Sequence, residues 1–451
     1  MTKQKNIKGI KMMKKRYIVF ILMFILLIIF IVILIFKNNN NTIFSANTQK
    51  NLASTSYITW TQAQQGTGWE YITSITGTSD GGVIGVGLMF TYSASTGVDV
   101  NGDGITEEFS LGNDDGIIVN YDSDGNLNWS KTFGGEYDDK LNKVVLTSDG
   151  GFVIVGYTSS YEVYYDGSKI SELSIDTNNE NIKNKDGILI KISSNGEYEW
   201  GIRIGGTYDD EIISVIETSD GNIAIVGRYY SNTFNFFDKG DLSTVKATII
   251  KGSSYSYIMN GFLASYTSSG AYNWSQNISG TYDVEVIDIT ETTQGIAIGL
   301  NYVASGSTKA NYVYLDTDRT INQTGTSSSY TNGLVVGYDL DGTYSWRYRF
   351  YASSSYNVAI GAISVGINDE IYVGVNYYCA LLGGQNGATG DDLSKSTKST
   401  YYAGTVIKLS NEGEYTETVF TIDGDYDDYI SDIVGTLDRR NYFMWMVLFN
   451  I

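Results

Sequence analysis

Residues 115–157 read DGIIVNYDSDGNLNWSKTFGGEYDDKLNKVVLTSDGGFVIVGY, and the same pattern recurs along the chain. A second clear copy occupies residues 186–228, and weaker copies begin at Asn260, Asn332 and Ala403. The second-position glycines of successive copies are 71, 74, 72 and 71 residues apart, and a partial copy that contains Trp60 precedes them. This fixed period predicts a repeat architecture whose units pack side by side and share one core.

Each copy contains four short runs of apolar and β-branched residues, which are typical of β-strands. In the first full copy the predicted strands are 117–121, 127–133, 141–147 and 152–157. Asp-Gly turns separate the first strand from the second and the third from the fourth, as in tight hairpins. The pattern predicts an all-β chain with a β-propeller of about six four-stranded blades.

The ring is expected to close when a last strand at 441–451 joins the first strands of the chain, which removes exposed edges. A seven-bladed ring is the alternative. The tryptophans of the second strands, Trp129, Trp200, Trp274 and Trp346, are expected to pack between neighbouring units.

The N-terminal region predicts a membrane anchor. Residues 1–16 contain seven lysines and arginines and no acid, and residues 17–36 contain no charge at all. Twenty apolar residues in a helix match the thickness of a bilayer core, and the basic flank marks the cytoplasmic side. We therefore expect a cytoplasmic tail (1–16), one transmembrane signal-anchor helix (17–36), a linker (37–56) and a propeller (57–451). A cleaved signal peptide is the alternative, although its apolar stretch is usually shorter.

This organisation predicts a single-pass protein of the cell membrane, with the propeller outside the cytoplasm. The chain carries a net charge of −20, which disfavours nucleic acid as a partner. It contains no histidine and one cysteine, which excludes Ser-His-Asp and Cys-His catalysis and any internal disulfide. An enzyme on this chain would have to work with carboxylates, tyrosine, lysine or a bound cation.

Two stretches carry a resemblance to a known family. TSDGG followed by FVIVGYTSS (147–160), and YDSDGNLNWSKTFGG (121–135), resemble the bacterial exported β-propeller-repeat proteins, which are distantly similar to quinoprotein-type propellers. The resemblance covers about residues 57–451 and implies a propeller fold and an exported location. It implies little about chemistry.

Long polar insertions follow the fourth strand of each copy, at 88–113, 157–185, 228–259, 302–331 and 376–403. They are rich in Tyr, Ser, Thr, Asn and Gly, which is the chemistry of antibody binding loops. Antiparallel strand order puts these insertions on the same face as the connections between second and third strands. We therefore expect a binding face built from loops; solvated loops without a ligand are the alternative.

A Tyr-Asp signature recurs before each third strand, and Trp69 falls at nearly the same place in the partial copy. Aromatic side chains and carboxylates arranged in a circle are suited to binding a sugar, a cation or a basic peptide. The alternative is structural, with tyrosines packed between blades and aspartates capping turns. The candidate binding residues are Tyr137, Asp138, Tyr208, Asp209, Tyr282, Asp283, Tyr356, Tyr426 and Asp427.

A calcium loop is predicted at 99–107, in the first insertion. Oxygen-bearing side chains occupy its positions 1, 3, 5 and 9, and glycine occupies position 6, as in known calcium loops. The candidate ligands are Asp99, Asn101, Asp103, Glu107 and the backbone carbonyl of Ile105. A metal-free Asn-Gly-Asp-Gly turn is the alternative.

Together these features predict a non-catalytic binding or adhesion module that recognises a glycan or protein ligand at the cell surface. Two alternatives stay open. One is a glycoside-acting enzyme that uses a pair of carboxylates. The other is a scaffold that organises a complex at the membrane surface.

Overall fold

The computed structural model describes residues 42–46, 60–66, 69–90, 97–103, 106, 108–175, 184–251, 257–304, 312–324, 330–352, 356–378, 381–386, 389–395, 401–423, 426–434 and 444–445. The predicted tail and transmembrane segment (1–36) lie outside these residues. Among the residues described, no helix is long and apolar enough to cross a membrane.

The four strands predicted in the first full copy are confirmed. They are β7 (Asp114–Tyr121), β8 (Leu127–Gly134), β9 (Asp139–Leu146) and β10 (Phe152–Thr158). The two predicted turns are also present, because Gly125 and Gly150 have φ angles of 87° and 84° that favour glycine. The later copies form β13 (Asp186–Ile192), β14 (Tyr198–Ile204), β15 (Asp210–Glu217), β16 (Ile223–Tyr229), β19 (Asn260–Tyr266), β20 (Tyr272–Gly280), β21 (Val284–Thr292), β22 (Gly295–Ala304), β25 (Tyr330–Tyr338), β26 (Tyr344–Ala352), β27 (Val358–Val365), β28 (Ile371–Tyr377), β31 (Ala403–Leu409) and β32 (Tyr415–Ile422).

The boundaries of the sheets do not coincide with the boundaries of the sequence copies, and the repeat alone does not reveal this offset. β10 pairs with β13 of the next copy, from Phe152 opposite Ile192 to Thr158 opposite Asp186. Each sheet therefore joins the last two strands of one copy to the first two of the next, in the order β9-β10-β13-β14. The partial copy supplies β3 (Trp69–Gly77) and β4 (Val83–Phe90), which pair with β7 and β8 in the same way.

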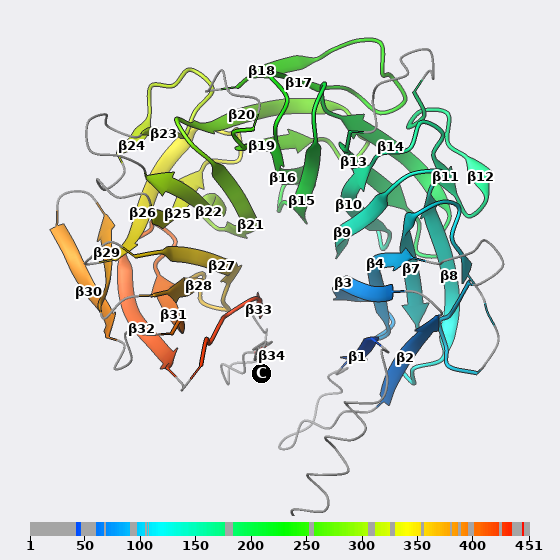
Figure 1. Cartoon of the computed structure of the whole chain (residues 1–451), viewed down its shortest axis with the longest axis horizontal. Coiled ribbons are helices and arrows are strands. Elements are labelled where there is room, and N and C mark those ends of the chain that lie inside the picture. The colour runs from blue at the N-terminus through cyan, green and yellow to red at the C-terminus, as the bar shows by residue number, and fades with distance from the viewer. Residues whose placement is uncertain are drawn as a thin grey trace, which may run out of the picture.

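These sheets are arranged around a common centre (Figure 1). The strands β3, β9, β15, β21 and β27 lie innermost, and each contacts the next around the ring. Buried aliphatic and aromatic side chains fill the space between successive sheets, as the cluster around Val155, Ile202, Ile225 and Phe262 shows. The described chain is thus all-β, with antiparallel sheets in a propeller-like arrangement.

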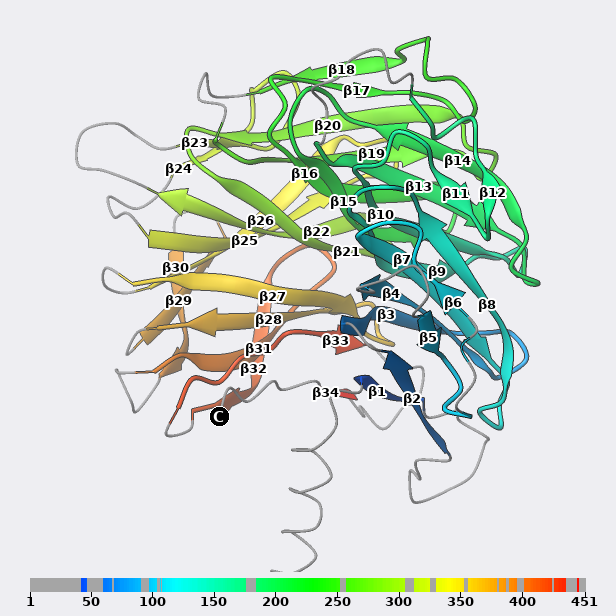
Figure 2. The same cartoon turned by 45° about the vertical axis from the view of Figure 1, so that its right-hand side comes forward.

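The first and last described strands lie on the same side of the ring. β1 (Thr42–Ala46) and β2 (Trp60–Gly66) form one sheet with β5 (Gly97–Asp99) and β6 (Glu108–Phe109), and β33 (Ile433–Val434) pairs with β34 (Met444–Trp445). Figures 1 and 2 place β34 and β1 on the same side of the ring. Of the closing strand predicted at 441–451, only β34 falls among the described residues.

The insertions fold differently from the loops that we expected. In their described parts they form hairpins that extend the outer edges of sheets, because an outer strand leaves backbone groups unpaired. The hairpin β11–β12 pairs with β8, β23–β24 with β20 and β29–β30 with β26, whereas β17–β18 touches β14 through a bridge between Gly205 and Asn235. Their strands are β11 (Tyr164–Tyr165), β12 (Ser168–Lys169), β17 (Thr233–Phe236), β18 (Ala247–Ile250), β23 (Tyr312–Tyr314), β24 (Asn322–Thr324), β29 (Leu381–Asn386) and β30 (Thr389–Lys395).

The tryptophans pack between sheets, as predicted. The ring of Trp274 on β20 lies over Gly342, which is in the β25–β26 turn of the next sheet, and a Cβ at Gly342 would approach that ring to 2.6 Å. Trp274 Nε1 also donates a hydrogen bond to Leu340 O at 3.0 Å. Trp129 and Gly196 form the same contact between two earlier sheets.

Replacing Trp274 with alanine is expected to lower the free energy of unfolding by roughly 2–3 kcal/mol, because a half-buried ring and its hydrogen bond are lost. Urea denaturation of the full-length protein measures the change. Trp69→Ala is the control, since the Trp69 side chain is 70% exposed. Equal effects of the two substitutions would contradict the inter-sheet role of Trp274.

Candidate functional site

The Tyr-Asp signature lies where the chain enters each inner strand. Corresponding ends of the inner strands share one face of the ring, which we call the mouth face. Tyr137 is half-buried and packs edge-on against Tyr161, with 5.6 Å between ring centroids. The other signature tyrosines are 37–70% exposed: Tyr208, Tyr282, Tyr356 and Tyr426.

The aspartates of the signature have a structural role, as the alternative interpretation holds. Asp209, Asp283 and Asp427 each accept a hydrogen bond from the backbone N–H two residues before the second-position glycine of their own copy, and so tie the start of the first strand to the start of the third. The bonds run from Lys185 N to Asp209 Oδ1 (3.1 Å), from Met259 N to Asp283 Oδ1 (2.8 Å) and from Tyr402 N to Asp427 Oδ1 (2.8 Å). Asp138 is exposed, and its backbone carbonyl accepts from Ser159 N at 3.0 Å. The signature tyrosines Tyr208, Tyr282, Tyr356 and Tyr426 are exposed beside these bonds.

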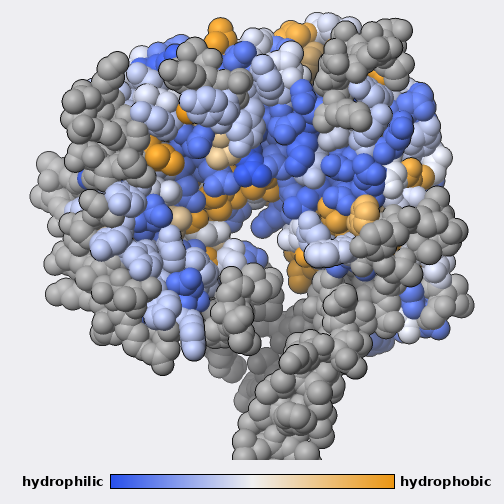
Figure 3. Space-filling view, viewed as in Figure 1, coloured by the Kyte–Doolittle hydropathy of each residue, from blue (hydrophilic) through white to orange (hydrophobic). Residues whose placement is uncertain are grey.

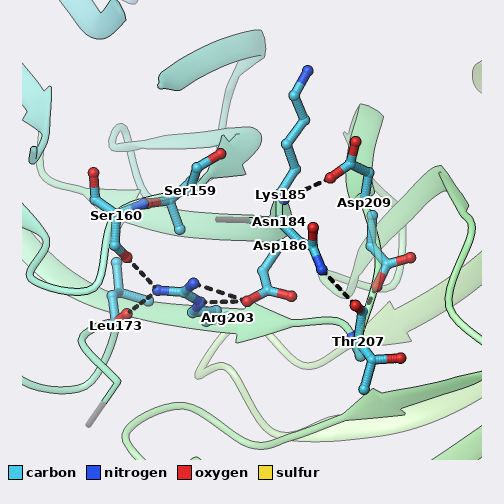
Figure 4. Close-up of polar contacts among 12 residues, drawn as sticks. Ser159, Ser160, Leu173, Asn184, Lys185, Asp186, Arg203, Thr207 and Asp209 are labelled. Carbon is cyan, nitrogen blue, oxygen red and sulfur yellow. Dashed lines mark hydrogen bonds and ion pairs between the residues drawn. The ribbon is translucent and has the colours of Figure 1, made fainter. Parts of the chain in front are cut away.

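A buried ion pair lies behind the mouth face in the second full copy (Figure 4). Arg203 on β14 places Nε and Nη2 each 2.8 Å from Oδ2 of Asp186 on β13. Its Nη1 donates to the carbonyls of Ser160 (2.8 Å) and Leu173 (3.1 Å). The Arg203 side chain is 3% exposed, so its charge is balanced almost entirely by these groups.

The first full copy has the same acids without the arginine. Asp115 and Asp139 correspond to Asp186 and Asp210, and Thr132 stands at the register of Arg203. Burial raises the pKa of Asp115 to about 6 and that of Asp139 to about 7. Asp115 Oδ1 has no hydrogen-bond partner in the part of the chain that the structure describes.

Both carboxylates pack against Gly134. A Cβ at that glycine would lie 2.0 Å from Asp115 Oδ1 and 2.9 Å from Asp139 Oδ2. Asp139 also accepts from Gly135 N (2.7 Å) and Ser160 Oγ (2.7 Å). A proton held between the two carboxyls would supply the positive charge that Arg203 supplies in the next copy.

Charged side chains gather on the mouth face between β10 and β21. Arg228 on β16 contacts both Glu211 and Glu285, the latter at 2.7 Å. Lys185 Nζ lies 4.1 Å above the ring of Tyr157. Figure 3 shows an opening at the centre of the ring, bordered by hydrophilic and hydrophobic residues.

An aromatic part of the same face comes from segments further along the chain. Its five rings follow one another in a series that we call the tyrosine row. Successive ring centroids are 6.5, 5.5, 5.3 and 5.2 Å apart along Tyr330, Tyr356, Tyr378, Tyr402 and Tyr429.

The predicted calcium loop lies at the outer edge of the β1-β2-β5-β6 sheet. Asp99 is 8% exposed, and its Oδ1 accepts from Gly102 N at 2.6 Å, while Asn101 Oδ1 accepts from Asp103 N at 2.9 Å. Two candidate ligands, Ile105 and Glu107, lie outside the described residues. Within those described, no group of three or more Asp, Glu, Cys or His side chains is placed to hold a metal. Calcium therefore stays a prediction.

Sequence reasoning missed the buried acids and the tyrosine row. The buried acids stand near the starts of strands. Asp115 and Asp186 are the first residues of their copies, and Asp139 and Asp210 are the third residues of the Tyr-Asp-Asp signature. An alignment of the copies would have shown that these acids recur. The row combines Tyr356 of the signature with tyrosines from strand ends, such as Tyr378 and Tyr402. Those tyrosines are distant in sequence and have no fixed spacing.

Comparison with known proteins adds little. No family model matches the chain, and no curated protein matches it either. Among solved structures, the crystal structure of Sqt1 from Chaetomium thermophilum is similar, with a TM-score of 0.32 and 9% identity over 80% of this chain and 90% of that chain. A similarity this low carries no argument about function.

Proposed function

We propose that this chain is a membrane-anchored binding module whose six-bladed β-propeller recognises a glycan or protein ligand outside the cytoplasm. In this proposal residues 17–36 cross the membrane, and strands from both ends of the chain complete the sixth blade. The position of β34 and β1 on the same side of the ring supports a shared blade. The binding role rests on one observation, the recurrence of exposed tyrosines on the mouth face in successive sheets.

The glycoside-acting alternative is less well supported. Its general acid would need a carboxyl with a raised pKa that can reach a sugar. Burial raises the pKa of Asp139 to about 7 and that of Asp210 to about 8, but these residues are only 0% and 1% exposed. Both carboxylates accept hydrogen bonds from neighbouring turns, so their shifted pKa values reflect enclosure within the fold.

The proposal is tested by binding of the full-length protein to glycan and protein arrays. Replacing Tyr208, Tyr282, Tyr356 and Tyr426 together with serine should weaken binding at least roughly tenfold, because exposed aromatic rings dominate such contacts. Tyr164→Ser, on the outer hairpin β11–β12, is the control and should bind normally. Binding by the fourfold variant at the original strength would refute the proposal.

The same arrays test the calcium prediction when they are read in about 1 mM calcium and again with a chelator, since extracellular sites of this kind fill at millimolar calcium. An Asp99→Asn/Asp103→Asn variant should lose any difference between the two conditions. A calcium effect that survives in this variant would place the ion elsewhere.

A further inference from the structure

We infer that the tyrosine row binds an extended, uncharged polysaccharide; this inference rests on the proposed function and specifies its ligand. The row spans three neighbouring sheets. Tyr356, at the entry to β27, is 40% exposed, and the other four rings are partly exposed. Aromatic rings in this state can pack against the apolar faces of sugar rings while the sugar hydroxyls remain in water.

The row is held in place before any ligand arrives. Tyr378 N donates to Asn357 O at 3.0 Å, and Asn357 Nδ2 donates to Tyr402 Oη at 3.3 Å. Tyr402 N donates to Asp427 Oδ1 at 2.8 Å, and Tyr402 O accepts from Asp428 N at 2.9 Å. A platform whose backbone is fixed in this way loses little conformational entropy on binding.

The arrangement of the rings favours a long ligand over a compact one. A quaternary ammonium group is held by several aromatic rings around one point. Here the rings are arranged in series, with steps of 5.2–6.5 Å between neighbouring centroids and planes tilted by 33–59° to one another. A chain of repeating units can use all of these contacts, whereas a single small group cannot.

Charge selects an uncharged chain. The segments that carry the row (330–332, 356–359, 376–378, 401–404 and 426–430) contain no lysine or arginine, and their only charged residues are Asp427 and Asp428. Asp427 is used by Tyr402, and Asp428 is 4% exposed. Single-stranded nucleic acid also stacks on aromatic rows but requires a basic groove, and an acidic polysaccharide would be repelled by a chain of net charge −20.

Affinity electrophoresis of the full-length protein tests the inference. Native gels that contain a soluble β-glucan, mannan or xylan should retard the protein, and gels that contain polygalacturonate should not. Tyr356→Ala and Tyr402→Ala should each weaken retention roughly tenfold, the loss expected for one stacked contact. Tyr356→Phe should retain most of the binding, because it keeps the ring.

Tyr71→Ala is the matched control, because Tyr71 on β3 is also 40% exposed but belongs neither to the row nor to the Tyr-Asp signature. It should leave retention unchanged. Retention lost equally in Tyr71→Ala and Tyr356→Ala would overturn the row as the site while leaving the proposed function intact. The ligand class would be overturned by a different result. In that result no neutral polysaccharide retards the protein, and a proline-rich peptide or a quaternary ammonium ligand binds through Tyr356 instead. If the fourfold tyrosine variant still binds the arrays at the original strength, the proposed function itself is wrong.

Discussion

Replacing Arg203 with leucine is expected to lower the free energy of unfolding by roughly 3–5 kcal/mol. The substitution removes the guanidinium that lies 2.8 Å from Asp186 and leaves that carboxylate without its counter-charge. Asp186 is 8% exposed, and burial already raises its pKa despite the arginine. The carbonyls of Ser160 and Leu173 also lose their donor. Urea denaturation at pH 8, where the carboxyl is hardest to protonate, gives the largest difference.

The third copy of the repeat provides the control. Asn260 stands where the second copy has Asp186, and Asn277 stands at the register of Arg203. A double variant, Asp186→Asn/Arg203→Asn, therefore reproduces the two neutral side chains that the third copy carries at these positions. It should recover more than half of the stability that Arg203→Leu loses. If the double variant is as unstable as the single one, the loss comes from packing rather than from the unpaired charge.

The free energy of unfolding should fall by roughly 3 kcal/mol or more between pH 5 and pH 8. Burial raises the pKa of Asp115, Asp139 and Asp210 to about 6, 7 and 8, from an ordinary value of 3.8. In this window the folded protein holds protons that the unfolded chain has released. The contribution of these three carboxyls to stability is therefore greatest below the ordinary pKa and decreases as the pH rises through the folded values. The chain has no histidine, so side chains with unshifted pKa values contribute little to the change in stability between pH 5 and pH 8.

Asp139→Asn isolates the contribution of the first copy. The substitution removes one of the three carboxyls whose pKa burial raises, so the variant should lose a substantial part of the decrease in stability between pH 5 and pH 8. Asp138→Asn changes an exposed neighbour and should leave the pH dependence intact. Denaturation midpoints in urea, measured at half-unit steps of pH, distinguish the variants. A flat profile for the unmodified protein would show that these carboxyls are ionised in the folded state.

Strand positions could be predicted because each strand is bounded by turn residues. The strand predicted at 117–121 ends at Tyr121, as β7 does, and the turn at Gly125 follows it. The composition of the sheets could not be predicted in the same way. Nothing in the insertion after Thr158 tells whether the next strand extends the same sheet or starts another. Backbone pairing decides that question, and it depends on the whole ring.

The candidate site shows the same limit. Recurrence identified the signature, and the exposed rings of Tyr208 and Tyr356 are consistent with contact to a ligand. Recurrence could not separate these tyrosines from the aspartates beside them, because a capping role also repeats in every copy. The insertions misled for a physical reason: Tyr and Asn suit a binding loop and also suit an edge hairpin such as β23–β24.

The offset between copies and sheets has a consequence for how the chain is made. β9 and β10 leave the ribosome well before β13 and β14, which complete their sheet. A nascent chain that ends after any whole copy therefore always presents an unfinished two-stranded hairpin, which is marginally stable alone. A break inside an insertion, such as 157–185 between β10 and β13, divides a sheet into two hairpins, whereas a break between the second and third strands of a copy, such as β14 and β15, falls between sheets. The natural sites for splitting this protein into fragments that reassemble are therefore the connections between second and third strands.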